Sequence, residues 1–149
     1  MKRSRMNCPT CKSFLHTKHP AEHRRLKMFA KFICWTIRGE KHATTRLSKK
    51  PLGDYTLGTQ QPYHKFDDYG VIVRIHKIVV WKIGGIRPKR LLQLAKLEGF
   101  KSSEEFVKEL YKINAKRIDG KKLNNTTPLY THYYKVLKVP ARMRQLYED

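Results

Sequence analysis

The chain has 149 residues, with 33 Lys and Arg against 12 Asp and Glu, so its formal net charge at neutral pH is +21. Such a charge favours a polyanionic partner, and nucleic acid is the first to consider, because each phosphate that a protein neutralises releases condensed counterions. No apolar run is long enough to span a membrane and the first residues lack the apolar stretch of a secretory signal, so we expect a cytoplasmic protein.

The basic residues are concentrated near the amino terminus. Residues 1–50 contain 14 basic and 2 acidic side chains, whereas residues 51–149 contain 19 and 10. Residues 1–25 also show little hydrophobic periodicity, which predicts a basic extension outside the folded core. We expect this extension to contact a nucleic-acid backbone through Arg3, Arg5, Lys12, Arg24 and Arg25.

The extension also carries a candidate metal site. Cys8 and Cys11 have the two-residue spacing of a zinc knuckle, and histidines follow within ligand range. Two thiolates and two imidazoles, from Cys8, Cys11, His19 and His23, would complete a tetrahedral site for a structural zinc ion. The alternative is that both cysteines are free thiols in a reducing compartment.

Three elements are expected before residue 82. From Leu26 apolar side chains recur at steps of three and four residues, which predicts a short amphipathic helix that ends at Gly39. Residues 48–66 contain many Gly and Pro residues, and this density of breakers predicts a long irregular loop. From Tyr69 to Trp81 nearly every residue is β-branched, aromatic or aliphatic, which predicts a long strand with a bend near Lys77.

Two helices are expected next. Pro88 suits the first turn of a helix that continues to Leu97. Ser102 and Glu105 form a capping box for a second helix that ends near Asn114.

The last part of the chain is expected to complete one domain. A basic, Asn-rich loop over residues 115–128 leads to a last strand over residues 129–139, and a short basic tail covers residues 141–149. Together the elements predict a single domain over residues 26–140 with an α+β fold, a small β-barrel flanked by helices.

A short polar motif follows the first predicted helix. Gly39-Glu40-Lys41-His42-Ala43-Thr44-Thr45-Arg46 sets a lysine, a threonine and an arginine at fixed offsets on a turn that enters an extended segment. Residues two apart in a strand share a face, so Thr44 and Arg46 are expected to point the same way while Lys41 reaches in from the turn. Taken alone, the motif also fits a solvated turn before an edge strand.

Four short motifs, in this order, resemble the ASCH domain, a relative of the PUA-like RNA-binding barrels. The Gly39–Arg46 turn is followed by Gly53-Asp54, by Tyr69-Gly70-Val71-Ile72-Val73, and by Ala95-Lys96-Leu97-Glu98-Gly99-Phe100 before a helix. The resemblance covers residues 24–139 and implies a PUA-like barrel. The lysine content is consistent with a thermophilic or archaeal source.

The resemblance also implies a reactive cluster. Some ASCH proteins use a Lys, Thr and Glu set to hydrolyse the amide of cytidine acetylated on its exocyclic amine, and Lys41, Thr44 and Glu98 match that set. A lysine with a lowered pKa can activate a threonine hydroxyl, and a carboxylate can orient the lysine or carry a proton. The alternative is structural: Lys41 and Glu98 form an ion pair and Thr44 fills a strand position.

The charge favours an RNA-binding protein over an enzyme, because a hydrolase that acts on a nucleoside has no need of so basic a surface. The expected partner is a structured RNA such as ribosomal or transfer RNA; the amidohydrolase and a DNA-binding accessory protein are the alternatives. Besides the extension, the expected RNA contacts are Lys41, Arg46, Lys49, Lys50, Lys116, Arg117, Lys121 and Lys122.

Overall fold

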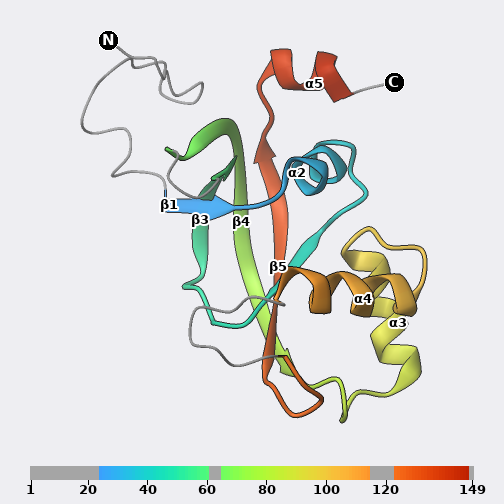
Figure 1. Cartoon of the computed structure of the whole chain (residues 1–149). Helices are drawn as coiled ribbons and strands as arrows, with labels where there is room; N and C mark the ends of the chain where they lie inside the picture. Colours follow the sequence, from blue (N-terminus) through green and yellow to red (C-terminus); the bar gives the residue numbers. More distant parts are fainter. Residues whose placement is uncertain (1–23, 61–64, 115–122, 148–149) are drawn as a thin grey trace.

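The computed structural model describes residues 24–60, 65–114 and 123–147. Its elements follow the chain in the order β1 (Arg24–Lys27), α2 (Ala30–Ile37), β2 (Ala43–Arg46), β3 (Gly53–Thr59), β4 (Asp67–Trp81), α3 (Pro88–Leu97), α4 (Ser103–Ile113), β5 (Leu129–Lys138) and α5 (Ala141–Tyr147) (Figure 1). The predicted α+β class is confirmed.

One sheet contains all five described strands, in the order β1-β3-β4-β5-β2. β1 is parallel to β3, and the other pairs are antiparallel. The long strand β4 pairs with β3 along one side and β5 along the other, and its register with β5 shifts between Ile75 and Lys77. This irregularity confirms the predicted bend near Lys77, since a bulge bends and twists its strand.

The sheet curls into a half-barrel. Its two edge strands, β1 and β2, do not pair with one another in the described part of the chain. They are nevertheless close, because the Arg46 guanidinium on β2 donates a hydrogen bond to the carbonyl oxygen of Lys27 at the end of β1. One side chain thus spans the gap that a closed barrel would fill with a strand ladder.

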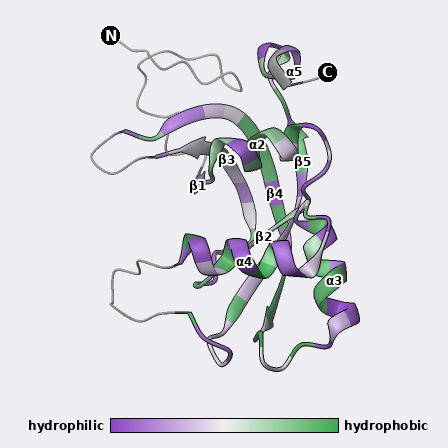
Figure 2. Cartoon of the chain, turned by 45° about the vertical axis from the view of Figure 1, so that its right-hand side comes forward, coloured by the Kyte–Doolittle hydropathy of each residue, from purple (hydrophilic) through white to green (hydrophobic). Residues whose placement is uncertain are grey.

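Two apolar clusters lie on the two sides of the sheet. The first fills the inside of the curl beneath α2 and includes Leu26, Ile33, Leu57, Val73 and Tyr134. The second joins α3 and α4 to the other face and includes Trp81, Leu94, Phe106, Leu110 and Leu129. Hydrophobic and hydrophilic residues alternate along α3 and α4, as expected for helices that bury one face (Figure 2). None of the described helices is long and apolar enough to cross a membrane.

The helix starts predicted for the second half are confirmed. Pro88 opens α3 in the first turn, where its missing N–H costs no hydrogen bond. The Ser102 side chain accepts a hydrogen bond from the backbone N–H of Glu105 at 3.2 Å, which caps α4.

Two segments differ from the sequence prediction. The helix expected from Leu26 begins only at Ala30, because residues 24–27 form β1 alongside β3. The loop expected over residues 48–66 contains β3. Its Gly58 does not break the strand but allows close packing, since a Cβ there would lie 2.4 Å from the Phe66 ring and from the Asp67 carbonyl oxygen. Residues 141–147 of the predicted basic tail form α5.

Candidate functional site

A buried ion pair stands at the centre of the polar motif. The Lys41 ammonium lies 2.9 Å from Glu98 Oε1, and the two side chains are only 2% and 5% exposed. Each residue sits at a helix end. Lys41 is on the turn after α2, and Glu98 is the C-cap residue directly after α3, followed by Gly99 with a φ of 95°. The backbone N–H of His42 donates to Leu97 O at 2.6 Å, so the turn is fastened to the end of α3.

The second carboxylate oxygen of Glu98 accepts from a threonine, and this threonine is Thr45. Thr45 Oγ1 lies 2.7 Å from Thr131 Oγ1, which in turn accepts from the Trp81 indole N–H at 2.7 Å. An indole nitrogen only donates and a carboxylate only accepts, so the protons have one consistent order, from Trp81 through Thr131 and Thr45 to Glu98. The chain of hydroxyls therefore ends in a hydrogen bond that Thr45 donates to the Glu98 carboxylate.

Burial and pairing act on Lys41 in opposite directions. Burial desolvates the ammonium and lowers the pKa of Lys41, the Glu98 carboxylate raises that pKa, and burial is the larger effect. The Lys41 ammonium also lies 4.8 Å from the centre of the Phe32 ring. With a carboxylate, a ring and the Glu98 carbonyl oxygen around it, Lys41 is enclosed by the protein.

Thr44 faces away from this pair. Neighbouring strand residues point to opposite faces, and Thr45 uses the face that carries Glu98 and Thr131. Thr44 is 7% exposed, and its hydroxyl has no hydrogen-bond partner within residues 24–60, 65–114 and 123–147. The structure therefore brings Lys41 and Glu98 together, as both interpretations of the sequence require, and supplies Thr45 as the hydroxyl that touches the carboxylate.

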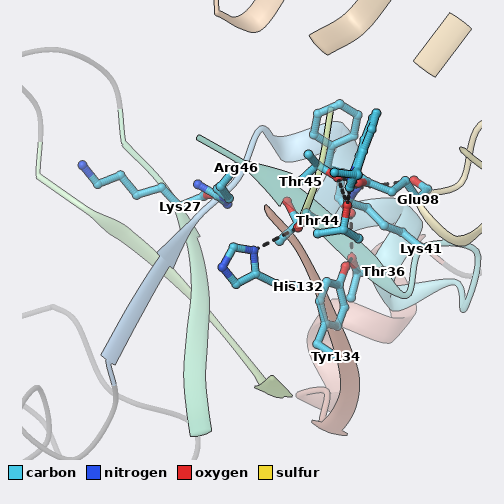
Figure 3. A network of polar contacts seen from close by, with 12 residues as sticks. Lys27, Thr36, Lys41, Thr44, Thr45, Arg46, Glu98, His132 and Tyr134 are labelled. Carbon is cyan, nitrogen blue, oxygen red and sulfur yellow. Dashed lines mark hydrogen bonds and ion pairs between the residues drawn. The ribbon is translucent and has the colours of Figure 1, made fainter. Parts of the chain in front are cut away.

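A buried histidine lies on the face that Thr44 uses. His132, opposite Thr44 in the ladder, accepts from the backbone N–H of Lys50 through Nε2 at 3.0 Å, and its Nδ1 lies 3.3 Å from the Thr44 carbonyl oxygen. A ring that accepts at one nitrogen and faces a carbonyl with the other is the neutral Nδ1–H tautomer. His132 thus fastens the segment that carries Lys50 to β2 and β5. Figure 3 shows the contact between His132 and Thr44.

Neutral His132 should make stability depend on pH. Burial, followed by the charges of Arg46 and Lys50, lowers the pKa of His132 below its ordinary 6.5. The unfolded chain then binds this proton more tightly, so the free energy of unfolding falls as the pH drops from about 7 to 5, by at most about 1.4 kcal/mol per pH unit. Denaturant unfolding at several pH values checks this. His132→Gln should make the free energy of unfolding less dependent on pH in this range. His76→Gln, at an exposed position, should leave the dependence as it is in the wild-type protein.

A tyrosine and a threonine close the inner end of the network. Thr36 Oγ1 donates to Phe32 O at 2.9 Å, so the Tyr134 hydroxyl, 2.6 Å away, is the donor to Thr36. Burial strongly raises the pKa of Tyr134, which keeps it protonated. Both groups are satisfied internally, and we assign them a structural role.

Three cations gather where the sheet edges approach. Figure 3 shows Lys27 and Arg46 on the side of the network away from Glu98. Burial lowers the pKa of Lys50, and the charges of Arg46 and Lys27 lower it further. Arg46 is itself half-buried, and burial lowers its pKa. We call Lys27, Arg46 and Lys50 the edge cluster; a bound anion would relieve the repulsion that Lys27 and Arg46 exert on Lys50.

The other predicted contacts are dispersed. Arg24 and Arg25 are exposed on β1 and lie over the rings of Tyr55 and Phe66, at 5.0 and 5.2 Å. Lys49 is exposed beside Lys50. The remaining predicted contacts, Arg3, Arg5, Lys12, Lys116, Arg117, Lys121 and Lys122, lie outside the described residues.

The zinc ligands predicted from the sequence, Cys8, Cys11, His19 and His23, also lie outside the described residues. Within the part of the chain that is described, no group of three or more His, Cys, Asp and Glu side chains could hold a metal ion. Cys34 is a half-buried free thiol.

Several site residues were not identified from the sequence, among them Lys27 of the edge cluster and Thr45, Trp81, Thr131 and His132 of the buried network. Thr45 is next to the predicted Thr44 and has the same side chain. The two differ only in the face of β2 to which their side chains point. Trp81, Thr131 and His132 join the site through the pairing of β5 with β2 and β4, which connects residues about 50 to 90 apart in sequence. The alternating pattern over 129–139 was the available signal, because it places Thr131 and His132 on opposite faces.

No family model matches the chain, and no curated protein matches it. Solved structures do match. Protein EF3133 from Enterococcus faecalis V583, described by the family model DUF984, has a TM-score of 0.58 at 13% identity, over 81% of this chain and 80% of that one. The ASCH domain from Lactobacillus crispatus JV V101 has a TM-score of 0.48 at 12% identity, over 82% of this chain and 86% of that one. The similarity is one of fold.

Proposed function

We propose that this chain binds structured RNA, with ribosomal or transfer RNA as the expected class, and that phosphate contacts provide most of the affinity. The observation that carries the proposal is the edge cluster, in which Lys27 and Arg46 act on Lys50 with charges of the same sign. The acid whose charge acts on Arg46 is Glu98, and it is already paired with Lys41, so the cluster keeps an excess of positive charge that suits a phosphate oxygen. The net charge of +21 extends the same preference over the whole chain.

The geometry assigns different tasks to the residues of the polar motif. Lys41 is enclosed and paired with Glu98, so we assign it to the structure that holds the turn in place. Arg46 joins β2 to β1 through Lys27 O and contributes its charge to the edge cluster. Lys50 is placed by His132. In this proposal the buried network positions the cations, and the cations bind the RNA backbone.

The direct test is the nucleic acid that accompanies the protein at low salt. We expect the purified protein to carry RNA that ribonuclease removes and deoxyribonuclease does not. Sequencing of that RNA should give ribosomal or transfer RNA. Protein that is free of RNA at low salt, and that does not bind added transfer RNA, would contradict the proposal.

A second candidate function is hydrolysis of cytidine acetylated on its exocyclic amine. The observation that favours it is the contact between a threonine hydroxyl and the Glu98 carboxylate. Glu98 could take the proton of Thr45 as that oxygen attacks the acetyl carbonyl and return it to the exocyclic nitrogen as the C–N bond breaks; water would then hydrolyse the acetyl-threonine ester to acetate. Thr45 is also more exposed than either Lys41 or Glu98.

Release of acetate from acetylated cytidine tests this second function. If Thr45 is the nucleophile, Thr45→Val should abolish turnover, while Thr44→Val, the matched change on the other face of the strand, should retain it. The opposite result would assign the nucleophile to Thr44, as the family resemblance implies. Absence of turnover in the wild-type protein would remove the hydrolase from consideration.

A further inference from the structure

A groove lies between the end of β4 and the start of α3, where the chain leaves the lower end of the sheet in Figure 1. It is lined by residues 79–82 and 85–87, with Arg90 and Leu94, and its volume is about 540 Å³. That volume is within the range of small-molecule and nucleotide sites, roughly 300 to 1,000 Å³. The groove uses none of the residues of the edge cluster.

The groove combines an apolar surface with a cationic rim. Val80 is 61% exposed although it is aliphatic, and Ile86, which also lines the groove, is half-buried. Lys82 and Arg87 are exposed, and neither side chain has an ion pair or a hydrogen bond with another residue in the described ranges. Arg90 donates to the Tyr133 hydroxyl at 3.0 Å, which holds it at the rim.

The part of the chain that forms the groove has basic residues but no acidic ones. Between Tyr69 and Leu97 the sequence has no Asp or Glu, although it has Lys or Arg at 74, 77, 82, 87, 89, 90 and 96. α3 begins here without an acidic residue in its first turn and without a side-chain cap, so the partial positive charge of its amino end is not neutralised. The electrostatic field of the groove therefore favours an anion.

The groove is also held in shape. The backbone N–H of Gly84 donates to Asn125 O at 2.9 Å, and the Asn125 side chain accepts from the Tyr111 hydroxyl at 3.3 Å. This fastens the turn between β4 and α3 to the segment before β5 and to α4. A preformed groove loses less entropy when it binds a ligand.

We propose that this groove is a second RNA contact, one that takes an unpaired nucleotide with its base against Val80 and Ile86 and its flanking phosphates on Lys82, Arg87 and Arg90. The inference rests on the proposed function and adds the kind of RNA segment to it. A paired base keeps both its faces stacked in the helix, whereas an unpaired base can place a face on an apolar surface. An apolar surface within a cationic rim is complementary to a single-stranded segment.

The test measures the affinity of the full chain for a ten-nucleotide oligouridine and for an RNA duplex of ten base pairs, at one fixed salt concentration. Val80→Glu places a carboxylate in the groove, and Val136→Glu places one at an exposed position of β5, so the two variants have the same net charge and the same type of site. We expect Val80→Glu to weaken oligouridine binding at least about tenfold and Val136→Glu no more than about twofold. The duplex should show no such difference.

A second pair of variants guards against effects on folding. Lys82→Gln with Arg87→Gln should weaken oligouridine binding more than Lys108→Gln with Lys112→Gln, which removes the same charge from the exposed face of α4. If the groove variant and its control lose the same affinity for oligouridine in both pairs, while the wild-type protein still binds RNA, the groove proposal is overturned and the proposed function is not. The groove would then be a candidate site for a protein partner. Wild-type protein that binds neither RNA would overturn the proposed function as well.

Discussion

Lys41→Met is expected to lower the free energy of unfolding by about 3–5 kcal/mol, because it leaves the buried Glu98 carboxylate without its counter-charge. Thr45 would still donate to that carboxylate, but one hydroxyl does not replace an ammonium at 2.9 Å. Urea unfolding of the wild-type and variant proteins measures the loss.

Two further variants make the Lys41 result specific. Lys31→Met breaks the exposed pair between Lys31 and Glu109, where the lysine is 47% exposed, and should cost no more than about 1 kcal/mol. Lys41→Met combined with Glu98→Gln should cost less than the sum of the single changes, because neither residue then leaves a buried charge unpaired. A loss below about 1 kcal/mol for Lys41→Met would contradict the buried ion pair.

The affinity for transfer RNA should fall steeply with salt. If the chain neutralises six or more phosphates, affinity is expected to drop by about a thousandfold or more between 50 and 200 mM salt. Each contact releases condensed counterions into the solution, and this release becomes less favourable as the salt concentration of the solution rises. Filter binding at several salt concentrations measures the slope, and melting temperatures at the same concentrations show that the protein stays folded. A flat response would show that apolar or hydrogen-bonded contacts dominate and would contradict a phosphate-based interface.

The sequence predicted those parts of the fold that depend on local patterns. The apolar run of β4, Pro88 at the start of α3 and the Ser102 cap of α4 act within a few residues, so their signals are visible along the chain. β3 was not predicted, because Gly58 looks like a breaker until Phe66 is seen to pack against it.

The sequence predicted only those site residues that the family resemblance indicated. The resemblance indicated Lys41 and Glu98, which lie 57 residues apart and form the ion pair. It did not indicate that Thr45 is the hydroxyl on Glu98, because this depends on the pairing of Thr45 with Thr131 across the sheet. The neutral state of His132 depends on the backbone N–H of Lys50, a contact that no local pattern reveals.

The central claim is that the edge cluster binds RNA phosphates, and the most direct measurement is the affinity for transfer RNA of a variant with Lys27→Gln and Lys50→Gln at 100 mM salt. The matched control is Lys108→Gln with Lys112→Gln, which removes the same charge from α4. Each lost phosphate contact should cost about eightfold at this salt concentration, so we predict a loss of tenfold or more for the edge variant and a smaller loss for the control. Equal losses in the two variants would show that only net charge matters and would contradict the claim.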